Sequence, residues 1–109
     1  MRMIEIPFAT ENWGEVEVTE PKGERGGAYW RKKQLGDIRV QMVEYSPGYI
    51  ADHWCEKGHV LLVLEGTLET ELKDGRKFML TPGTSYHVAD LVEPHRSTTR
   101  TGAKLFIVD

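Results

Sequence analysis

The chain has 109 residues, which is enough for one domain with one hydrophobic core, predicted to span residues 1–109. Its composition is normal for a globular protein, and the net charge of -3 gives no indication of a nucleic-acid or anionic membrane partner. It has no apolar run near the ~18 residues of a membrane span, no signal-like N-terminus and a single cysteine, so we expect a cytoplasmic protein without an internal disulfide.

The chain is predicted to fold as strands. Residues 1–27 carry Gly/Pro breaks and many acids, and we expect an irregular N-terminal arm there with one short strand. From residue 28 onward, no apolar pattern of helical period runs for three turns without a Gly or Pro, whereas alternation and β-formers are frequent. The predicted strands are 28–34, 38–46, 60–64, 68–72, the segment around 78–80, 84–88, 96–101 and 103–108.

Turn signals separate these strands at short intervals. Gly36, Pro47-Gly48, Pro82-Gly83 and Gly102 each fall between two strands, and Asp74-Gly75 is a strong two-residue hairpin signal. Many short strands with turns at this spacing are typical of a β-sandwich or a small barrel. The pattern therefore predicts an all-β fold over residues 28–109.

Metal-ligand residue types fall into two short windows. The first reads His53-Trp54-Cys55-Glu56-Lys57-Gly58-His59, and the second is Pro94-His95-Arg96. If the first window is extended, His53 and Cys55 point to one side, and a tight turn at 56–58 would return His59 to the same point. Imidazole and thiolate are common ligands of zinc, iron, nickel and copper.

These windows resemble the motifs of the cupin superfamily (RmlC-like). The pattern Gly48, His53-x-Cys55-x3-His59-x6-Gly66 is similar to the first cupin motif, with Cys55 in place of its second His and His59 in place of its Glu. The second motif is matched by His95, after a slightly longer turn. The resemblance implies a cupin double-stranded β-helix (a jelly-roll barrel) with a divalent metal in its mouth.

The whole chain also resembles a narrower group, the DHCW-motif cupin-fold proteins. The segments that carry this resemblance are VEYSPGY (43–49), ADHWCEKGH (51–59), LEGTLETELKDGR (64–76) and VADLVEPHRS (88–97). The four named letters appear here in the order Asp52-His53-Trp54-Cys55. The narrower group implies no particular reaction, and a fold alone does not give a function.

The resemblance implies a mononuclear metal site at His53, His59 and His95, with Cys55 as a fourth ligand. Such ligands suit a divalent transition metal (Zn, Fe, Ni or Co) better than Mg(II) or Ca(II). Cys55 has a second interpretation as a small buried residue, because free Cys is among the most buried residue types. The alternative for all three histidines is a metal-free cupin in which they only form hydrogen bonds in the barrel mouth.

Four further residues are candidates for the pocket or for orienting a ligand. His87 replaces His95 if the second motif is aligned on Pro82, and otherwise lies on a strand near the site. Asp52 is either a solvated acid or the acceptor that orients an imidazole. Trp30 and Tyr86 either line the pocket or pack in the core.

Two functions follow from a site of this kind. One is a metal-dependent enzyme that acts on a small-molecule ligand, with an oxygenase-like reaction at an open three-His site. The other is a non-catalytic small-molecule or metal-binding module, or a sensor, whose site is closed and structural. We also expect a homodimer, with the apolar segment 105–108 as a bare edge strand for pairing.

Overall fold

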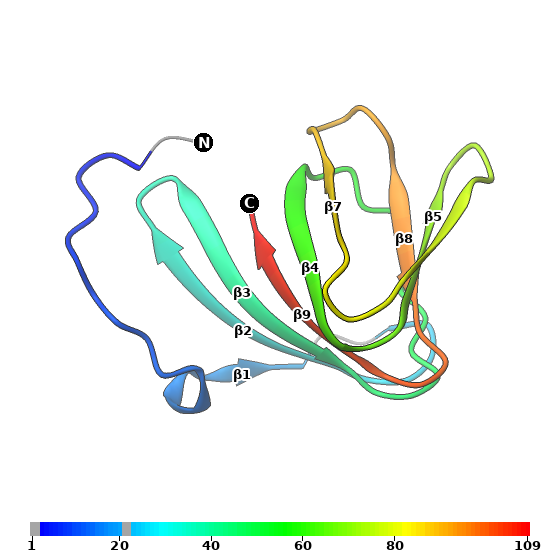
Figure 1. Cartoon of the computed structure of the whole chain (residues 1–109), viewed down its shortest axis with the longest axis horizontal. Helices are drawn as coiled ribbons and strands as arrows, with labels where there is room; N and C mark the ends of the chain where they lie inside the picture. The colour runs from blue at the N-terminus through cyan, green and yellow to red at the C-terminus, as the bar shows by residue number, and fades with distance from the viewer. Residues whose placement is uncertain (1–2, 21–22) are drawn as a thin grey trace.

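Two antiparallel β-sheets face each other, and Figure 1 shows the larger one curving toward the smaller one. The computed structural model describes residues 3–20 and 23–109, so residues 1–2 and 21–22 of the predicted arm lie outside it. The larger sheet has the spatial order β1 (Val18–Thr19), β2 (Ala28–Leu35), β3 (Ile38–Tyr45), β9 (Ala103–Val108), β4 (His59–Gly66), β7 (Ser85–Val88). The smaller sheet has the order β6 (Lys77–Leu80), β5 (Leu68–Leu72), β8 (His95–Thr98).

The predicted all-β class is confirmed, and most strand boundaries agree with the sequence pattern to within one or two residues. The described residues of the arm form the short strand β1 and a 3-10 turn, Trp13–Glu15, capped by the Asn12 side chain. In the part of the chain that the structure describes, no helix is long and apolar enough to cross a membrane. The largest boundary difference is at the end of β8, which was predicted as 96–101 and instead runs from His95 to Thr98.

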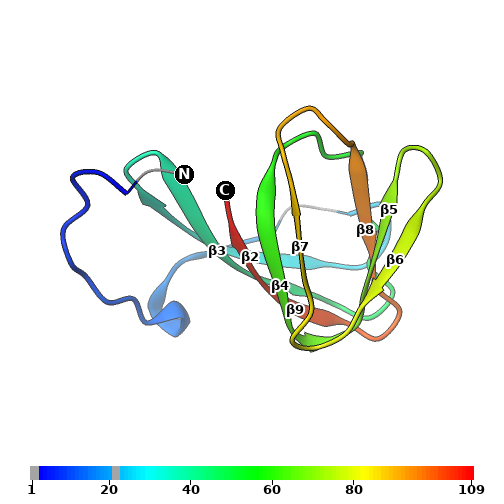
Figure 2. The ribbon, with the colours of Figure 1, turned by 45° about the horizontal axis from the view of Figure 1, so that its top comes forward.

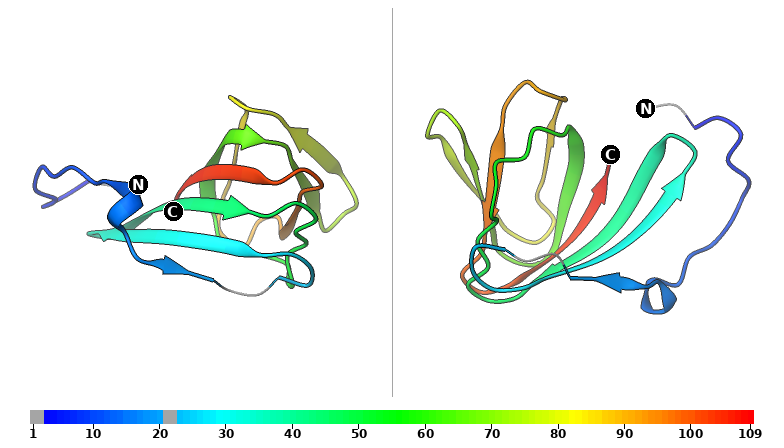
Figure 3. Two further views of the ribbon diagram at one scale, coloured as in Figure 1. Left: turned by 90° about the horizontal axis from the view of Figure 1, so that it is seen from below. Right: turned by 180° about the vertical axis from the view of Figure 1, so that it is seen from behind.

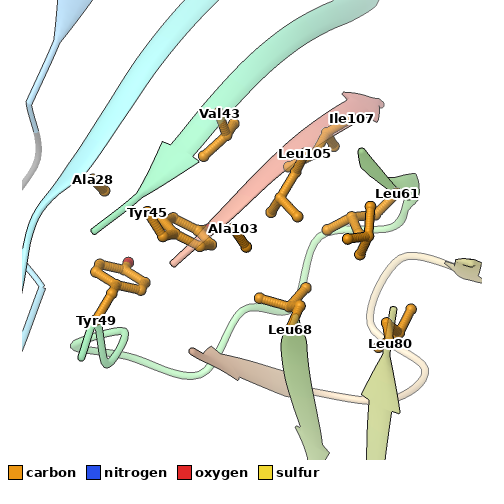
Figure 4. Close-up of a cluster of buried hydrophobic side chains, with 11 residues drawn as sticks. Ala28, Val43, Tyr45, Tyr49, Leu61, Leu68, Leu80, Ala103, Leu105 and Ile107 are labelled. Atoms are coloured by element: carbon orange, nitrogen blue, oxygen red, sulfur yellow. The ribbon is translucent and has the colours of Figure 1, made fainter. Parts of the chain in front are cut away.

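The core lies between the two sheets because each strand presents alternate residues to the same side. β9 shows this directly, since Ala103, Leu105 and Ile107 are buried while the residues between them are partly exposed. Figure 4 shows these side chains pointing toward those of β4 and of the smaller sheet. The buried set is completed by Ala28, Val43, Tyr45, Tyr49, Leu61, Val63, Leu68 and Leu80.

The segment between β3 and β4 pairs with the free edge of β8, so it connects the larger sheet to the smaller one. Ile50 bridges both Arg25 and Thr98, and Cys55 bridges His95. Figure 2 shows this connection passing from the end of β3 to the beginning of β4 beside the smaller sheet. In this segment the chain bends at 52–53 and Cys55 forms the bridge, and the tight turn considered at 56–58 does not form.

The predicted role of segment 105–108 as a bare edge is also wrong. β9 pairs with β3 on one side and with β4 on the other, as Figure 3 shows from two further directions. Both rows of its backbone hydrogen-bonding groups are therefore used inside the sheet. Homodimerisation itself stays a prediction.

Candidate functional site

A cavity of about 190 Å³ lies between the larger sheet and the segment that precedes β4. Its walls come from both sheets and from that segment, so residues far apart in the sequence meet there. All four predicted metal ligands line this cavity, namely His53, Cys55, His59 and His95. Trp30 and Tyr86 line it as well. The cavity is therefore the place where the two sequence windows meet.

His95 is the most deeply buried of the four predicted metal ligands. It is the first residue of β8 and only 2% exposed, and its backbone exchanges two hydrogen bonds with Cys55, of 2.7 and 3.0 Å. Its ring Nδ1 lies 2.9 Å from the carbonyl oxygen of Glu93, so Nδ1 carries the proton and donates it. The other ring nitrogen, Nε2, is buried and has no hydrogen-bond partner among the described residues.

Cys55 is a candidate partner of the His95 ring. Contact with the Cys55 thiol raises the pKa of His95, and the same contact lowers the pKa of Cys55. The contact falls short of hydrogen-bond geometry, and His95 Nε2 therefore stays unsatisfied. A partly exposed thiol with a lowered pKa, beside an imidazole, has the character of a metal-binding or reactive cysteine.

His59 stands next to His95 on the opposite sheet. The two ring centroids are 4.9 Å apart and the rings are nearly perpendicular. With metal–nitrogen bonds of about 2.0–2.1 Å, two imidazoles that share one ion have ring centroids roughly 4.5–5.2 Å apart. Burial, and then the neighbouring His95, lowers the pKa of His59 to about 4, so its imidazole is neutral and able to bind a metal at neutral pH.

Tyr86 holds the His59 ring in place. Its hydroxyl lies 2.8 Å from His59 Nε2, and burial raises the pKa of Tyr86, which keeps the hydroxyl protonated. This contact leaves Nδ1 as the free nitrogen of His59. Either ring nitrogen of a histidine is able to bind a metal, and the partner of the other nitrogen decides which one does.

His53 is the candidate ligand whose side chain is exposed, whereas the other three are buried or partly buried. Its side chain is 74% exposed, on the bend at 52–53, and its Nδ1 lies 2.6 Å from Asp52 Oδ1. The hydrogen bond from His53 lowers the pKa of Asp52. Within residues 3–20 and 23–109, no three His, Cys, Asp or Glu side chains lie close enough together to hold a metal ion as they stand.

The remaining predicted residues have distinct places. His87 is exposed on β7, pairs with Val60 of β4, and lines other pockets of the surface rather than this cavity. Asp52 is the acceptor that holds the His53 ring. Trp30 forms part of the cavity wall and packs edge-on against Tyr45, with 6.3 Å between the ring centroids.

The sequence analysis missed a polar group formed by two residues of β3 and by the residue that follows β9. Arg39 binds Asp109 with two hydrogen bonds of 3.0 Å, and Gln41, only 1% exposed, donates from Nε2 to Asp109 Oδ2 at 3.4 Å. All three residues line the cavity. The signal that indicates Gln41 is its parity, because it alternates with the buried Val43 and Tyr45 of the same strand.

Comparison with solved structures places this arrangement among known folds. The chain is similar to a sugar phosphate isomerase of the cupin superfamily from Silicibacter pomeroyi, with 18% identity, a TM-score of 0.75, and 92% of this chain and 74% of that chain covered. It is also similar to an RmlC-like cupin from Shewanella frigidimarina, with 19% identity, a TM-score of 0.72, and 96% and 92% covered.

The description of a third similar structure names a metal. It is Fe(II)-HppE with an alternative substrate, with 16% identity, a TM-score of 0.77, and 94% of this chain and 60% of that chain covered. No protein-family model matches the sequence, and a search of the curated proteins finds no match. The closer resemblance to the DHCW-motif proteins stays a prediction. The curved sheets, the cavity between them and these three structures together show that the chain has the fold of the RmlC-like cupins.

Proposed function

We propose that this protein binds one divalent transition metal in the cavity and acts there on a small molecule. The proposed ligands are His59 and His95, with Cys55, and His53 joins them from the bend in the preceding segment. Neutral imidazoles and a thiolate favour zinc, iron, nickel or cobalt over magnesium or calcium.

The single observation that carries the proposal is the free Nε2 of His95. A buried ring nitrogen without a partner costs stability, and natural proteins rarely retain one without a reason. The carbonyl of Glu93 fixes the tautomer so that Nε2 holds the lone pair, which is the usual arrangement of a metal-binding histidine. A metal ion would satisfy this atom.

The other two histidines support the same interpretation. Asp52 holds Nδ1 of His53 and Tyr86 holds Nε2 of His59, so each ring has one engaged nitrogen and one free nitrogen. Orienting partners of this kind normally accompany metal-ligating histidines. His87 provides the contrast, since none of the side-chain hydrogen bonds in the described part of the chain involves it.

The cavity favours an enzyme over a closed structural site. It extends past the imidazoles to Trp30, Gln41 and Tyr45, which leaves room for a small molecule beside the metal. A bound metal would supply Lewis acidity or redox chemistry, while the protein residues hold the substrate, exclude water and fix the imidazoles. The descriptions of the similar structures, an isomerase and an iron-containing protein with a substrate, are in keeping with this proposal.

The test is the metal content of untagged protein after exhaustive dialysis, measured by mass spectrometry. We expect about one equivalent of zinc, iron, nickel or cobalt in the wild type, as a mononuclear site requires. His95→Ala should retain only traces, because it removes the ligand at the centre of the site. His87→Ala is the matched control and should keep the wild-type content, since His87 is exposed outside the cavity.

Two results would contradict the proposal. One is an absence of bound metal in the wild type even after reconstitution with each of the four ions. The other is equal metal content in wild type and His95→Ala, with circular dichroism showing that both are folded.

A further inference from the structure

Two buried polar groups on neighbouring strands of the cavity wall have hydrogen-bonding capacity that the described residues do not use. Gln41 of β3 is 1% exposed, and its Oε1 is a buried acceptor without a partner. Trp30 of β2 has a buried Nε1–H donor without a partner. Both residues line the cavity that contains His59 and His95. An unsatisfied donor and an unsatisfied acceptor in one cavity indicate a ligand that supplies both complements.

The orientation of the Gln41 amide is fixed by its neighbours. Its Nε2 donates to Asp109 Oδ2, and Asp109 is held by two hydrogen bonds from Arg39. The reverse orientation would place Oε1 against the carboxylate of Asp109, which repels it and offers no hydrogen. Oε1 is therefore a hydrogen-bond acceptor that has no donor among the described residues.

The strand register brings the two groups to the same face of the sheet. Trp30 is paired with Val43, so Gln41, two residues from Val43, is the diagonal neighbour of Trp30. Diagonal neighbours lie about 7–8 Å apart, so a small group between them is able to contact both. Tyr45 stacks on Tyr49 with 4.0 Å between ring centroids, and this stack supports the Trp30 ring from one side.

We infer that the cavity takes a small neutral molecule with a carboxamide or hydroxyl group. That group donates a hydrogen bond to Gln41 Oε1 and accepts one from Trp30 Nε1–H. The inference deepens the proposed function, because it names the class of molecule that lies beside the metal.

A carboxylate fits this position poorly. It only accepts hydrogen bonds, so it would leave Gln41 Oε1 unsatisfied. The cavity volume of about 190 Å³ is below the roughly 300 Å³ at which drug-sized ligands begin to fit, so the molecule is small.

The test follows the Trp30 indole signal by two-dimensional proton–nitrogen NMR, in protein made metal-free with EDTA. The chain has three tryptophans, and Trp30→Phe identifies the signal of Trp30. The probes are propionamide, propan-1-ol and propionate, which share one size and differ in charge and in hydrogen-bonding groups. We expect propionamide or propan-1-ol to shift the Trp30 signal saturably at millimolar concentration, and propionate to bind at least tenfold more weakly.

Variants separate the hydrogen bond from general packing. Gln41→Leu keeps the volume and removes the acceptor, and it should weaken binding of the neutral probe by about tenfold, the effect of one lost hydrogen bond. Gln34→Leu, at an exposed glutamine of β2, is the control and should bind like the wild type. If Gln41→Leu does not fold, the comparison of propionamide with propionate in wild-type protein still decides the question.

Three outcomes would overturn the inference. The first is that neither neutral probe shifts the Trp30 signal saturably. The second is that propionate binds as tightly as the neutral probes, and the third is that folded Gln41→Leu binds as tightly as the wild type. The experiment uses metal-free protein, so its result is independent of whether a metal binds to the histidines.

Discussion

At the scale of single residues, the site depends on polar side chains that a partner holds in one orientation. Glu93 orients His95, Tyr86 orients His59, and in both cases one ring nitrogen is left free. The histidines themselves could be predicted from the sequence, because their spacing resembles a known motif. Their orienting partners could not, because a backbone carbonyl and a tyrosine on another strand leave no mark in the local sequence.

The partial burial of His59 predicts a pH effect on the stability of metal-free protein. Its pKa is lowered from 6.5 to about 4, so between these values the unfolded chain binds a proton that the folded chain does not. Stability should therefore fall as the pH is lowered through this window, by at most about 1.4 kcal/mol per pH unit and by less because the ring is partly exposed. The check is urea unfolding of wild type and His59→Gln in the presence of EDTA.

The comparison of these two proteins isolates His59, because they share all other titratable groups. His59→Gln should show a shallower loss of stability between about pH 6.5 and about pH 4. Parallel curves for the two proteins would show that the pKa of His59 is the same in the folded and the unfolded state, which contradicts the prediction.

At the scale of strands and turns, alternation was a reliable guide and the connection before β4 was not. Strands such as β5 and β9 appear where the pattern predicts them, because one face of each is buried. The segment 51–58 has no such periodicity, and tertiary contacts determine its path. Gly58 N–H donates to Asp90 Oδ1 and Leu91 N–H donates to the Glu56 carbonyl, and both partners are more than thirty residues away in the chain.

Gly66, the final residue of the first motif, is required for a close approach of two chain segments at the end of β4. It has φ +75°, and a Cβ there would lie 2.0 Å from the carbonyl oxygen of Gly102. Gly75 also has positive φ, of +98°, but open space around it. We expect Gly75→Ala to cost about 1–2 kcal/mol from backbone conformation alone, and Gly66→Ala to cost clearly more, because the backbone of residue 102 must move.

Thermal unfolding of the two variants measures this difference. In a domain of this size, 1 kcal/mol corresponds to a melting-temperature shift of roughly 4–8 °C. Gly66→Ala should therefore melt well below Gly75→Ala, or fail to fold. Equal melting temperatures would mean that the Gly66–Gly102 approach is not needed for stability.

At the scale of the whole molecule, the fold could be predicted because two independent features agree. Short alternating strands predicted a barrel or sandwich, and the motif resemblance predicted the cupin arrangement of strands. The order of strands within a sheet has no local signal, which is why segment 105–108 was mistaken for an edge. Its apolar alternation is equally compatible with an interior strand, and β9 has that position, between β3 and β4.

The same topology explains how the proposed ligands come to line one cavity. β4 supplies His59, β8 supplies His95, and the connecting segment, paired to β8 at Cys55, supplies the thiol. A metal bound there would join both sheets and that segment. Its binding energy would therefore add to the stability of the folded state.

The most direct test of this account is a titration of metal-free protein with Co(II), followed by absorption spectroscopy. The account predicts saturation at about one equivalent, with cobalt bands and a thiolate-to-cobalt charge-transfer band. The charge-transfer band should be lost in Cys55→Ala, all bands should be lost in His95→Ala, and His87→Ala should match the wild type. A wild-type protein that shows no saturable cobalt spectrum, or a spectrum unchanged in His95→Ala, would contradict the proposed metal site.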